Sequence, residues 1–106
     1  MNVYDKLKKN GLYLDPNEVE RICKKYRIRE LSIFGSALRD DFNKDSDVDL
    51  LVSFINNMEI GLFEVMDVEE EFAKLLKRNI DIVPIEGLCY PDRRERILVS
   101  REIIYG

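Results

Sequence analysis

The sequence predicts one domain of the α/β or α+β class. Segments with apolar residues at helical spacing alternate with short β-favouring runs, in the order helix, strand, short helix, strand, long helix, strand, helix. The length of 106 residues suits one ordinary domain and is too short for two. A content of 45% apolar and 36% charged residues is typical of a globular chain. We therefore expect residues 1–106 to form a single domain.

Local signals place the helices. Asp15 and Pro16 suit the N-cap and first position of a helix, and Glu18 is placed to reach back to the cap. Asn79 follows the longest apolar stripe, where a left-handed C-cap residue is expected. Residues 1–10 have too few apolar positions to predict more than a short helix. We expect further helices over about residues 16–27, 37–39 (one or two turns) and 61–77. A last helix is expected to begin at residue 91, followed by a short extended tail.

Three runs rich in β-branched and apolar residues are expected to form strands, over residues 31–34, 48–54 and 80–85. The second of them, VDLLVSF, is the strongest strand signal in the chain. Asn56 and Asn57 then signal a turn. Pro84 has no backbone donor, so the third strand is expected to lie at a sheet edge or to end there.

The composition excludes several kinds of site. The chain has no histidine, so Ser-His-Asp and Cys-His triads, histidine-ligated zinc and histidine bases are absent. Cys23 and Cys89 form no CxxC motif, and we expect both to fill the core. With 17 basic and 21 acidic residues the net charge is −4, which argues against an extended nucleic acid as partner. Catalysis would have to use carboxylates, hydroxyls, lysines, arginines or a bound metal.

The apolar runs of the sequence are short. None approaches the length of a membrane-spanning helix, and the first ten residues lack the apolar stretch of a signal peptide. We therefore expect a cytosolic (cytoplasmic) protein that does not contact a membrane.

Residues 34–52, FGSALRDDFNKDSDVDLLV, carry the most informative pattern. Gly35-Ser36 follows a predicted strand and precedes a predicted helical turn. Unpaired amides at such a turn attract phosphate, glycine allows close approach to the backbone, and serine adds a hydroxyl donor. Because Gly-Ser also occurs in ordinary loops, this signal is weak by itself.

Asp47 and Asp49 lie two residues apart at the strongest strand. Side chains alternate along a strand, so both carboxylates project from the same face, about 7 Å apart at Cα. Such oxygen ligands suit Mg²⁺, with a nucleotide phosphate completing its shell. A solvated turn would explain Asp47 but not Asp49, which stands between Val48 and Leu50 and is costly to bury without compensation.

Asp81 repeats this pattern between Ile80 and Ile82. If its strand neighbours that of Asp49, three carboxylates meet and raise one another's pKa. A divalent cation would relieve the repulsion, and so would an ion pair with arginine or lysine. Two-metal phosphoryl-transfer sites have such an arrangement, and a carboxylate near the acceptor can orient or deprotonate it.

A calcium loop is a further interpretation, because Asp45, Asp47 and Asp49 also read as DxDxD. An EF-hand loop needs glycine at its sixth position and glutamate at its twelfth. Those positions hold Leu50 and Asn56, and the loop would break the best strand. We reject this interpretation.

The pattern Gly35-Ser36, ten residues, then Asp47-Val48-Asp49 resembles the signature of the DNA polymerase β-like nucleotidyltransferases. Residues 34–52 are similar to the FGSxARG…SDxDLLV pattern of the smallest members, the minimal (MNT-type) nucleotidyltransferases, and NIDIV matches the third carboxylate strand. The C-terminal ILVSREIIYG resembles the closing helix of that family, so the resemblance covers about residues 17–106. It implies a mixed β-sheet flanked by helices, with the site on two adjacent strands.

The resemblance also implies a function. Gly35 and Ser36 would hold the terminal phosphates of a nucleoside triphosphate, while Asp47, Asp49 and Asp81 would bind Mg²⁺, as two metals in the fuller form of the site. A nucleoside monophosphate, AMP from ATP in this group, would pass to a hydroxyl and release pyrophosphate. In the MNT group the acceptor is often a tyrosine on a HEPN-type ribonuclease toxin, and the MNT protein acts as antitoxin.

One position departs from the family pattern. The glycine that usually follows Arg39 is Asp40 here, which must adopt the backbone conformation that the glycine provides. Arg39 can reach the phosphates or form a surface pair with a neighbouring aspartate, and the sequence does not decide between the two. The acidic run 69–71 and the charged tract 92–96 are expected to be solvated helix faces, and Tyr105 to pack.

Two other functions remain open. The chain could be a binding module that neutralises a ribonuclease by covering it, without catalysis. Transfer to an aminoglycoside or a transfer RNA is a weaker interpretation, because such family members usually append an acceptor-binding domain, whereas about 20 residues follow the last predicted strand here. The acceptor site would then come from another chain, which predicts an oligomer or a heteromer.

Overall fold

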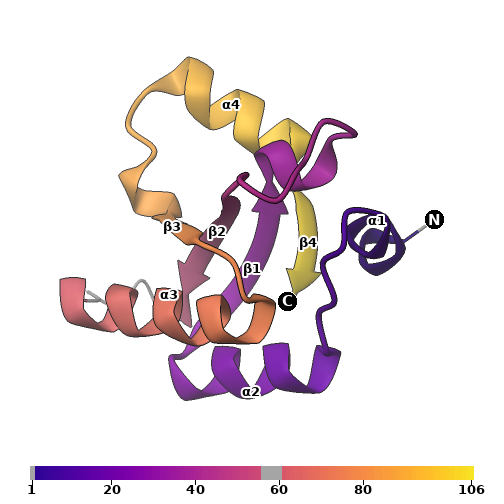
Figure 1. The fold of residues 1–106 in the computed structure, drawn as a ribbon. Coiled ribbons are helices and arrows are strands. Elements are labelled where there is room, and N and C mark those ends of the chain that lie inside the picture. Colours follow the sequence, from indigo (N-terminus) through magenta and orange to yellow (C-terminus); the bar gives the residue numbers. More distant parts are fainter. Residues whose placement is uncertain (1, 56–60) are drawn as a thin grey trace.

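The computed structural model describes residues 2–55 and 61–106. Its helices are α1 (Val3–Lys9), α2 (Pro16–Lys25), α3 (Leu62–Leu76) and α4 (Pro91–Ser100), and its strands are β1 (Ile28–Phe34), β2 (Val48–Phe54), β3 (Ile80–Pro84) and β4 (Glu102–Tyr105) (Figure 1). Two short 3₁₀ turns, η1 (Gly35–Leu38) and η3 (Ile85–Gly87), follow β1 and β3. The turn predicted at Asn56 and Asn57 lies outside the described residues. The predicted order of elements is confirmed.

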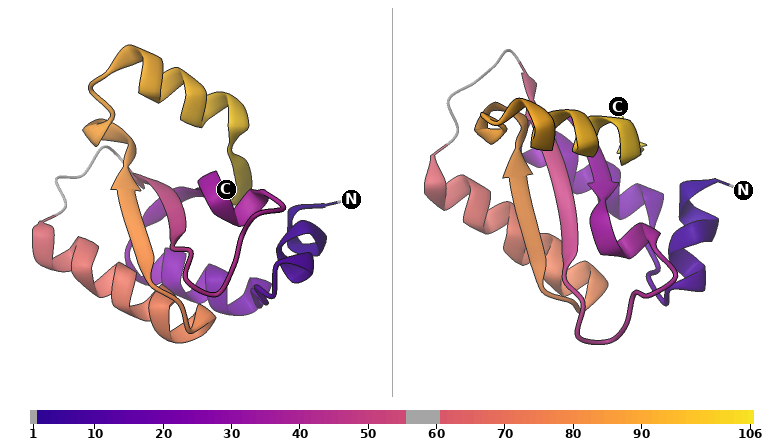
Figure 2. Two further views of the ribbon diagram at one scale, coloured as in Figure 1. Left: turned by 45° about the horizontal axis from the view of Figure 1, so that its top comes forward. Right: turned by 90° about the horizontal axis from the view of Figure 1, so that it is seen from above.

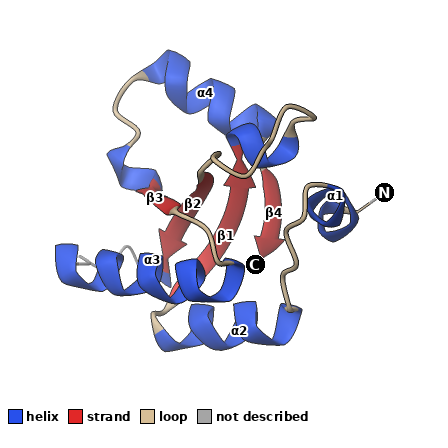
Figure 3. Cartoon of the chain, in the orientation of Figure 1, coloured by secondary structure: helices blue, strands red, loops and turns tan. Residues whose placement is uncertain are grey.

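The four strands form one mixed sheet in the order β3-β2-β1-β4 (Figure 3). β1 is antiparallel to both β2 and β4, while β2 and β3 are parallel, with α3 as the crossover between them. The mixed sheet flanked by helices is therefore confirmed. Pro84 ends β3 at the sheet edge, as predicted from its missing donor. Glu69 of α3 accepts a hydrogen bond from the amide of Ile82 on this strand (3.2 Å).

The sheet separates two apolar layers. α2 and α3 cover one face, and α4 crosses the opposite face (Figure 2). Alternation along β1 divides its side chains: Leu31 and Ile33 belong to the larger core, whereas Phe34 joins the smaller core beneath α4. Ile97 holds α4 on that smaller core. Tyr105 packs on the rim of the larger core, as expected.

Two boundaries differ from those predicted. β1 begins three residues early, at Ile28, because this buried residue pairs with Phe54 in the sheet. α2 correspondingly ends at Lys25. The left-handed residue that ends α3 is Lys77 (φ 56°), not Asn79. The carbonyl oxygen of Asn79 already accepts from the amide of Val48 (2.9 Å), so Asn79 belongs to the approach to β3.

The predicted N-terminal cap of α2 forms only in part. Asp15 caps α2 by accepting from the amide of Asn17 (2.9 Å), but Glu18 does not reach back. Its carboxylate pairs instead with Arg21 one turn later (2.9 Å). In a capping box Glu18 would accept a hydrogen bond from the backbone of Asp15, but here its carboxylate is used in an i,i+3 ion pair on the helix surface.

Two expectations about side-chain burial were also wrong. Cys23 is buried, and burial raises the pKa of its thiol to about 12, but Cys89 is exposed next to η3 and fills no core. In the run 69–71, only Glu70 lies on a solvated face. Glu71 is half-buried and forms ion pairs with Arg21 (3.3 Å) and Lys25 (3.1 Å), which tie α3 to α2.

Within the described parts of the chain, no helix combines the length and the apolar character needed to cross a bilayer.

Candidate active site

Two carboxylates lie side by side at the centre of the candidate site. The parallel register pairs Asp49 of β2 with Asp81 of β3. The neighbours of Asp49 along β2, Val48 and Leu50, belong to the larger core, so the Asp49 side chain points to the opposite face, toward α4. The same alternation places Asp81, next to the buried Ile82, on that face. The predicted adjacency of these two strands is confirmed.

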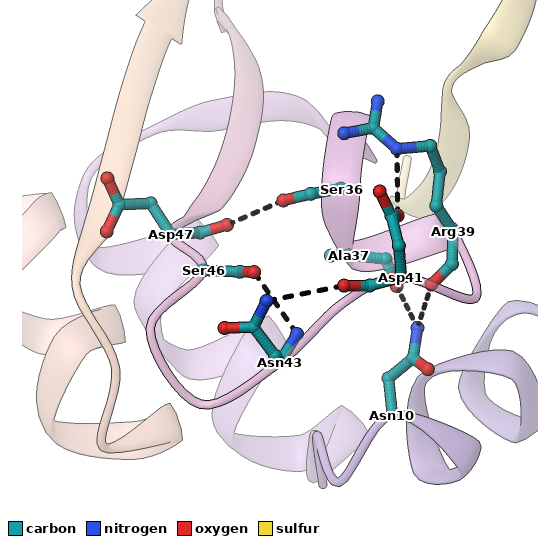
Figure 4. Close-up of polar contacts among 8 residues, drawn as sticks. All are labelled: Asn10, Ser36, Ala37, Arg39, Asp41, Asn43, Ser46 and Asp47. Carbon is teal, nitrogen blue, oxygen red and sulfur yellow. Dashed lines mark hydrogen bonds and ion pairs between the residues drawn. The ribbon is translucent and has the colours of Figure 1, made fainter.

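Asp47 comes directly before β2 and is exposed. It is two residues from Asp49, and its carboxylate points away from Ser36 (Figure 4). The hydroxyl of Ser36 donates to the backbone carbonyl of Asp47 (3.2 Å), so the start of η1 is tied to the segment that enters β2. Gly35-Ser36 and the first aspartate are therefore held together through the backbone of Asp47.

Gly35 is required by its backbone and by its surroundings. Its φ of +76° lies in the left-handed region, which favours glycine. A Cβ at this position would stand 2.7 Å from Oδ2 of Asp49, which is closer than any real contact. The sheet register explains the approach, because Phe34 pairs with Asp49 and brings the following turn over its carboxylate. Glycine thus leaves the backbone of η1 open beside the central carboxylate.

The electrostatics of Asp49 reflect its position. Burial raises the pKa of its carboxyl, and the nearby carboxylates of Asp81 and Asp47 raise it further. The guanidinium groups of Arg39 and Arg93 act in the opposite direction. Folding therefore makes ionisation of Asp49 less favourable than it is in the unfolded chain, and added positive charge would oppose this effect.

The chemistry of these side chains fits a hard divalent cation. Asp49 and Asp81 supply carboxylate oxygens from adjacent strands, which is the donor type that Mg²⁺ prefers. A cation would also remove the repulsion that raises the pKa of Asp49. Over the described residues, however, no three acidic or sulfur side chains converge into a ready ligand cluster, so Asp47 does not join the pair as a third ligand in this structure.

Arg39 forms a surface ion pair. Its Nε lies 3.2 Å from Oδ1 of Asp41, and both side chains are exposed (Figure 4). Asn10 of α1 donates to the carbonyl oxygens of Ala37 (2.8 Å) and Arg39 (3.1 Å), which anchors the end of η1. The structure thus contains the surface pair, although Arg39 remains close enough to affect the charge of Asp49.

Asp40 does not need the freedom of a glycine. Among the described residues other than glycine, positive φ occurs only at Arg27 and Lys77. Asp40 is exposed and has an ordinary backbone conformation. The turn after η1 is therefore made without a left-handed residue at this position.

Arg78 anchors the loop that leads to Asp47. Its Nη2 donates to the carbonyl oxygens of Asn43 (2.5 Å) and Ser46 (2.6 Å), and its guanidinium carbon lies 4.4 Å from the ring centre of Phe42. Arg78 lies three residues before Asp81. Arg78 therefore connects the loop before β2 with the segment before β3. The sequence did not indicate this role.

Arg93 and Arg96 of α4 were also missed. The tract 92–96 is exposed throughout, as expected, and these two arginines also line an open hollow of about 230 Å³ that includes Gly35. The only signal in the sequence is their i,i+3 spacing, which places both on one side of a helix. This spacing does not show which side faces the site.

Comparisons with known proteins agree with this arrangement. Residues 17–106 match the family described as polymerase beta, nucleotidyltransferase. The protein adenylyltransferase MntA of Thermococcus cleftensis is 38% identical over 87 residues, which cover 81% of this chain and 82% of that protein. A solved structure of a minimal nucleotidyltransferase is 30% identical, with a TM-score of 0.67, and the match covers 81% of this chain and 85% of that one.

A toxin-antitoxin crystal structure with AMP-PNP has a TM-score of 0.70 over 88% of this chain and 74% of that one, and at 15% identity it shows the fold alone. The fold and the family match together define a nucleotidyltransferase. The chain belongs to the polymerase beta nucleotidyltransferase family, and among its relatives are proteins named as protein adenylyltransferases.

Replacing Gly35 with alanine is expected to destabilise the fold more than the same change at Gly11. Both glycines have left-handed φ (+76° and +77°), so each substitution should cost about 1 kcal/mol for the backbone. Only at Gly35 does the new Cβ also collide with Asp49, which should add at least about 1 kcal/mol. Urea unfolding measures the difference. Equal costs at the two positions, or a difference that persists after Asp49→Ala, would contradict the close approach.

Arg78→Ala is expected to lower the free energy of unfolding by about 1–3 kcal/mol, because two hydrogen bonds to backbone carbonyls and the stacking on Phe42 are lost. Arg78→Lys keeps the charge but not the planar fork, so it should resemble alanine more than wild type. Denaturant unfolding of the three proteins tests this. A lysine variant as stable as wild type would show that charge alone matters.

Asp49→Asn is expected to raise the melting temperature at neutral pH in metal-free buffer. Folding raises the pKa of Asp49, so the folded chain loses stability as the pH rises from the ordinary aspartate value through this raised value. Below the ordinary value the carboxyl is neutral in both states, and the advantage of the variant should disappear. Melting curves across the pH range measure this, with the exposed Asp67→Asn as control. An advantage that does not change with pH would contradict the explanation.

Proposed function

We propose that this chain transfers AMP from ATP to a hydroxyl on a partner protein, and that it acts as the antitoxin of a HEPN-type toxin, with a tyrosine as acceptor. The observation that carries the proposal is the pairing of Asp49 with Asp81 directly beside the open backbone at Gly35. A relative with 38% identity is named a protein adenylyltransferase, which supports adenylyl transfer to protein. One structurally similar chain comes from a complex between an MNT antitoxin and a HEPN toxin that carries three AMP groups.

Each site residue has a role in this proposal. Asp49 and Asp81 would hold Mg²⁺, with Asp47 as a further ligand once its side chain turns toward the pair, and the bound cation would supply positive charge to the phosphate groups. Gly35 and Ser36 receive the terminal phosphates, because the glycine leaves the backbone uncovered and the serine hydroxyl can exchange its hydrogen bond to the Asp47 carbonyl for one to phosphate. Arg39 binds phosphate oxygens after leaving its exposed pair with Asp41, a pair that contributes little stability.

The reaction joins the acceptor oxygen to the α-phosphorus of ATP and breaks the bond between the α- and β-phosphates. The proton of the acceptor hydroxyl passes to a carboxylate of the site, and pyrophosphate leaves. Asp81 suits this step because it is exposed at the sheet edge, whereas Asp49 is half-buried. The acceptor approaches from outside the chain, so the complete site includes a second protein.

Label transfer tests the proposed reaction. Purified protein is incubated with Mg²⁺, ATP labelled at the α-phosphate and a lysate of its native cells, and a labelled protein band is expected with wild type. Asp49→Ala should reduce the label at least about a hundredfold, because the central carboxylate is lost. Asp67→Ala, which removes an exposed carboxylate on α3, should label as wild type does.

Equal labelling by Asp49→Ala and wild type would remove the role of the carboxylate pair. Absence of any band, with the toxin shown to be present in the lysate, would instead favour a module that neutralises its partner by binding alone. Protection of cells by Asp49→Ala distinguishes the two, since a binding module needs no carboxylate at this position.

A further inference from the structure

Helix α4 presents two arginines to the candidate site. Arg93 and Arg96 line the open hollow of about 230 Å³ together with Phe34, Gly35, Ile97 and Ser100. Ile97 is buried against Phe34 in the smaller core, so α4 is fixed on the sheet at this point. The hollow is therefore lined by apolar side chains of the smaller core, by the glycine and by two arginines.

Neither guanidinium has an acidic partner. Across residues 2–55 and 61–106, no carboxylate lies within ion-pair distance of Arg93 or Arg96. Arg96 makes one long hydrogen bond, from Nε to the carbonyl oxygen of Asp92 (3.4 Å), which leaves its other donors available.

The position of these arginines matters for an anion. Asp47, Asp49 and Asp81 would repel a polyphosphate that approached Gly35. Arg93 is close enough to Asp49 to oppose the effect of burial and of the other carboxylates. Arg94, in the same helix, is exposed but does not line the hollow. Of these three neighbouring arginines, Arg93 and Arg96 therefore place their positive charge near Gly35.

We propose that Arg93 and Arg96 form a phosphate-binding subsite on α4 that holds the β- and γ-phosphates of the donor nucleoside triphosphate beside Gly35. The planar guanidinium fork bonds two phosphate oxygens at once, which suits a terminal diphosphate. The subsite deepens the proposed function and rests on it for the identity of the donor. It also gives α4 a direct part in ligand binding, in addition to covering the smaller core.

The test measures binding of pyrophosphate, ATP and AMP by calorimetry in buffer with Mg²⁺. The double variant R93Q/R96Q is compared with R94Q, which removes one charge from the same helix outside the hollow. We expect R93Q/R96Q to weaken binding of pyrophosphate and ATP about tenfold or more and to leave binding of AMP within about twofold. R94Q should bind all three ligands as wild type does. Melting curves confirm that each variant is folded.

The outcomes separate this subsite from the proposed reaction. If wild type binds no pyrophosphate, or if R93Q/R96Q binds pyrophosphate and ATP as tightly as R94Q does, the subsite is wrong even when AMP transfer is observed. An equal loss for AMP and ATP would also overturn it, because AMP has no β- or γ-phosphate. If pyrophosphate binding depends on the two arginines but no AMP is transferred to protein, the subsite stands and the proposed function fails.

Discussion

The parallel pairing of β2 with β3 is the constraint on which the site depends. It places Asp49 next to Asp81, two like charges that the fold keeps together although folding makes ionisation of Asp49 less favourable. The surrounding structure holds this costly arrangement in place. The residues that flank Asp49 on β2 are buried, and Gly35 gives the room that its carboxylate occupies. An arrangement that costs stability and is held this firmly is typical of a functional site.

The two faces of the sheet differ: one forms the larger core, and the other carries the polar groups of the candidate site. One face is packed by α1, α2 and α3 into the larger core. The other is covered by the single helix α4 and carries polar groups, among them the buried hydroxyls of Ser32 and Ser53, which contact Arg101 (3.2 Å) and Arg29 (2.8 Å). On this face Asp81 is exposed and Asp49 is half-buried, so α4 does not cover the acidic pair completely.

Sequence patterns located most of the fold and the acidic centre. A run of apolar and β-branched residues predicted β2, and a carboxylate inside that run marked Asp49 as a candidate, since its burial there is costly without compensation. Where patterns failed, a competing contact had replaced the local signal. Glu18 found a partner in Arg21, and Asn79 was drawn into the backbone pairing with Val48. The first contact is local, at i,i+3 spacing on one helix, and competes with the cap, whereas the second joins segments that local sequence rules do not compare.

By itself, the sequence determined the order of elements, the edge position of Pro84 and the acidic residues available for chemistry, because these follow from local spacing and residue type. Only the tertiary structure decided that Arg78 joins the approaches to both acidic strands and that Arg93 and Arg96 face Gly35. These contacts span from about 30 to 60 residues of chain. They depend on how α3, β3 and α4 pack on the sheet, and the spacing of charges along a helix does not show which side of it will meet the site.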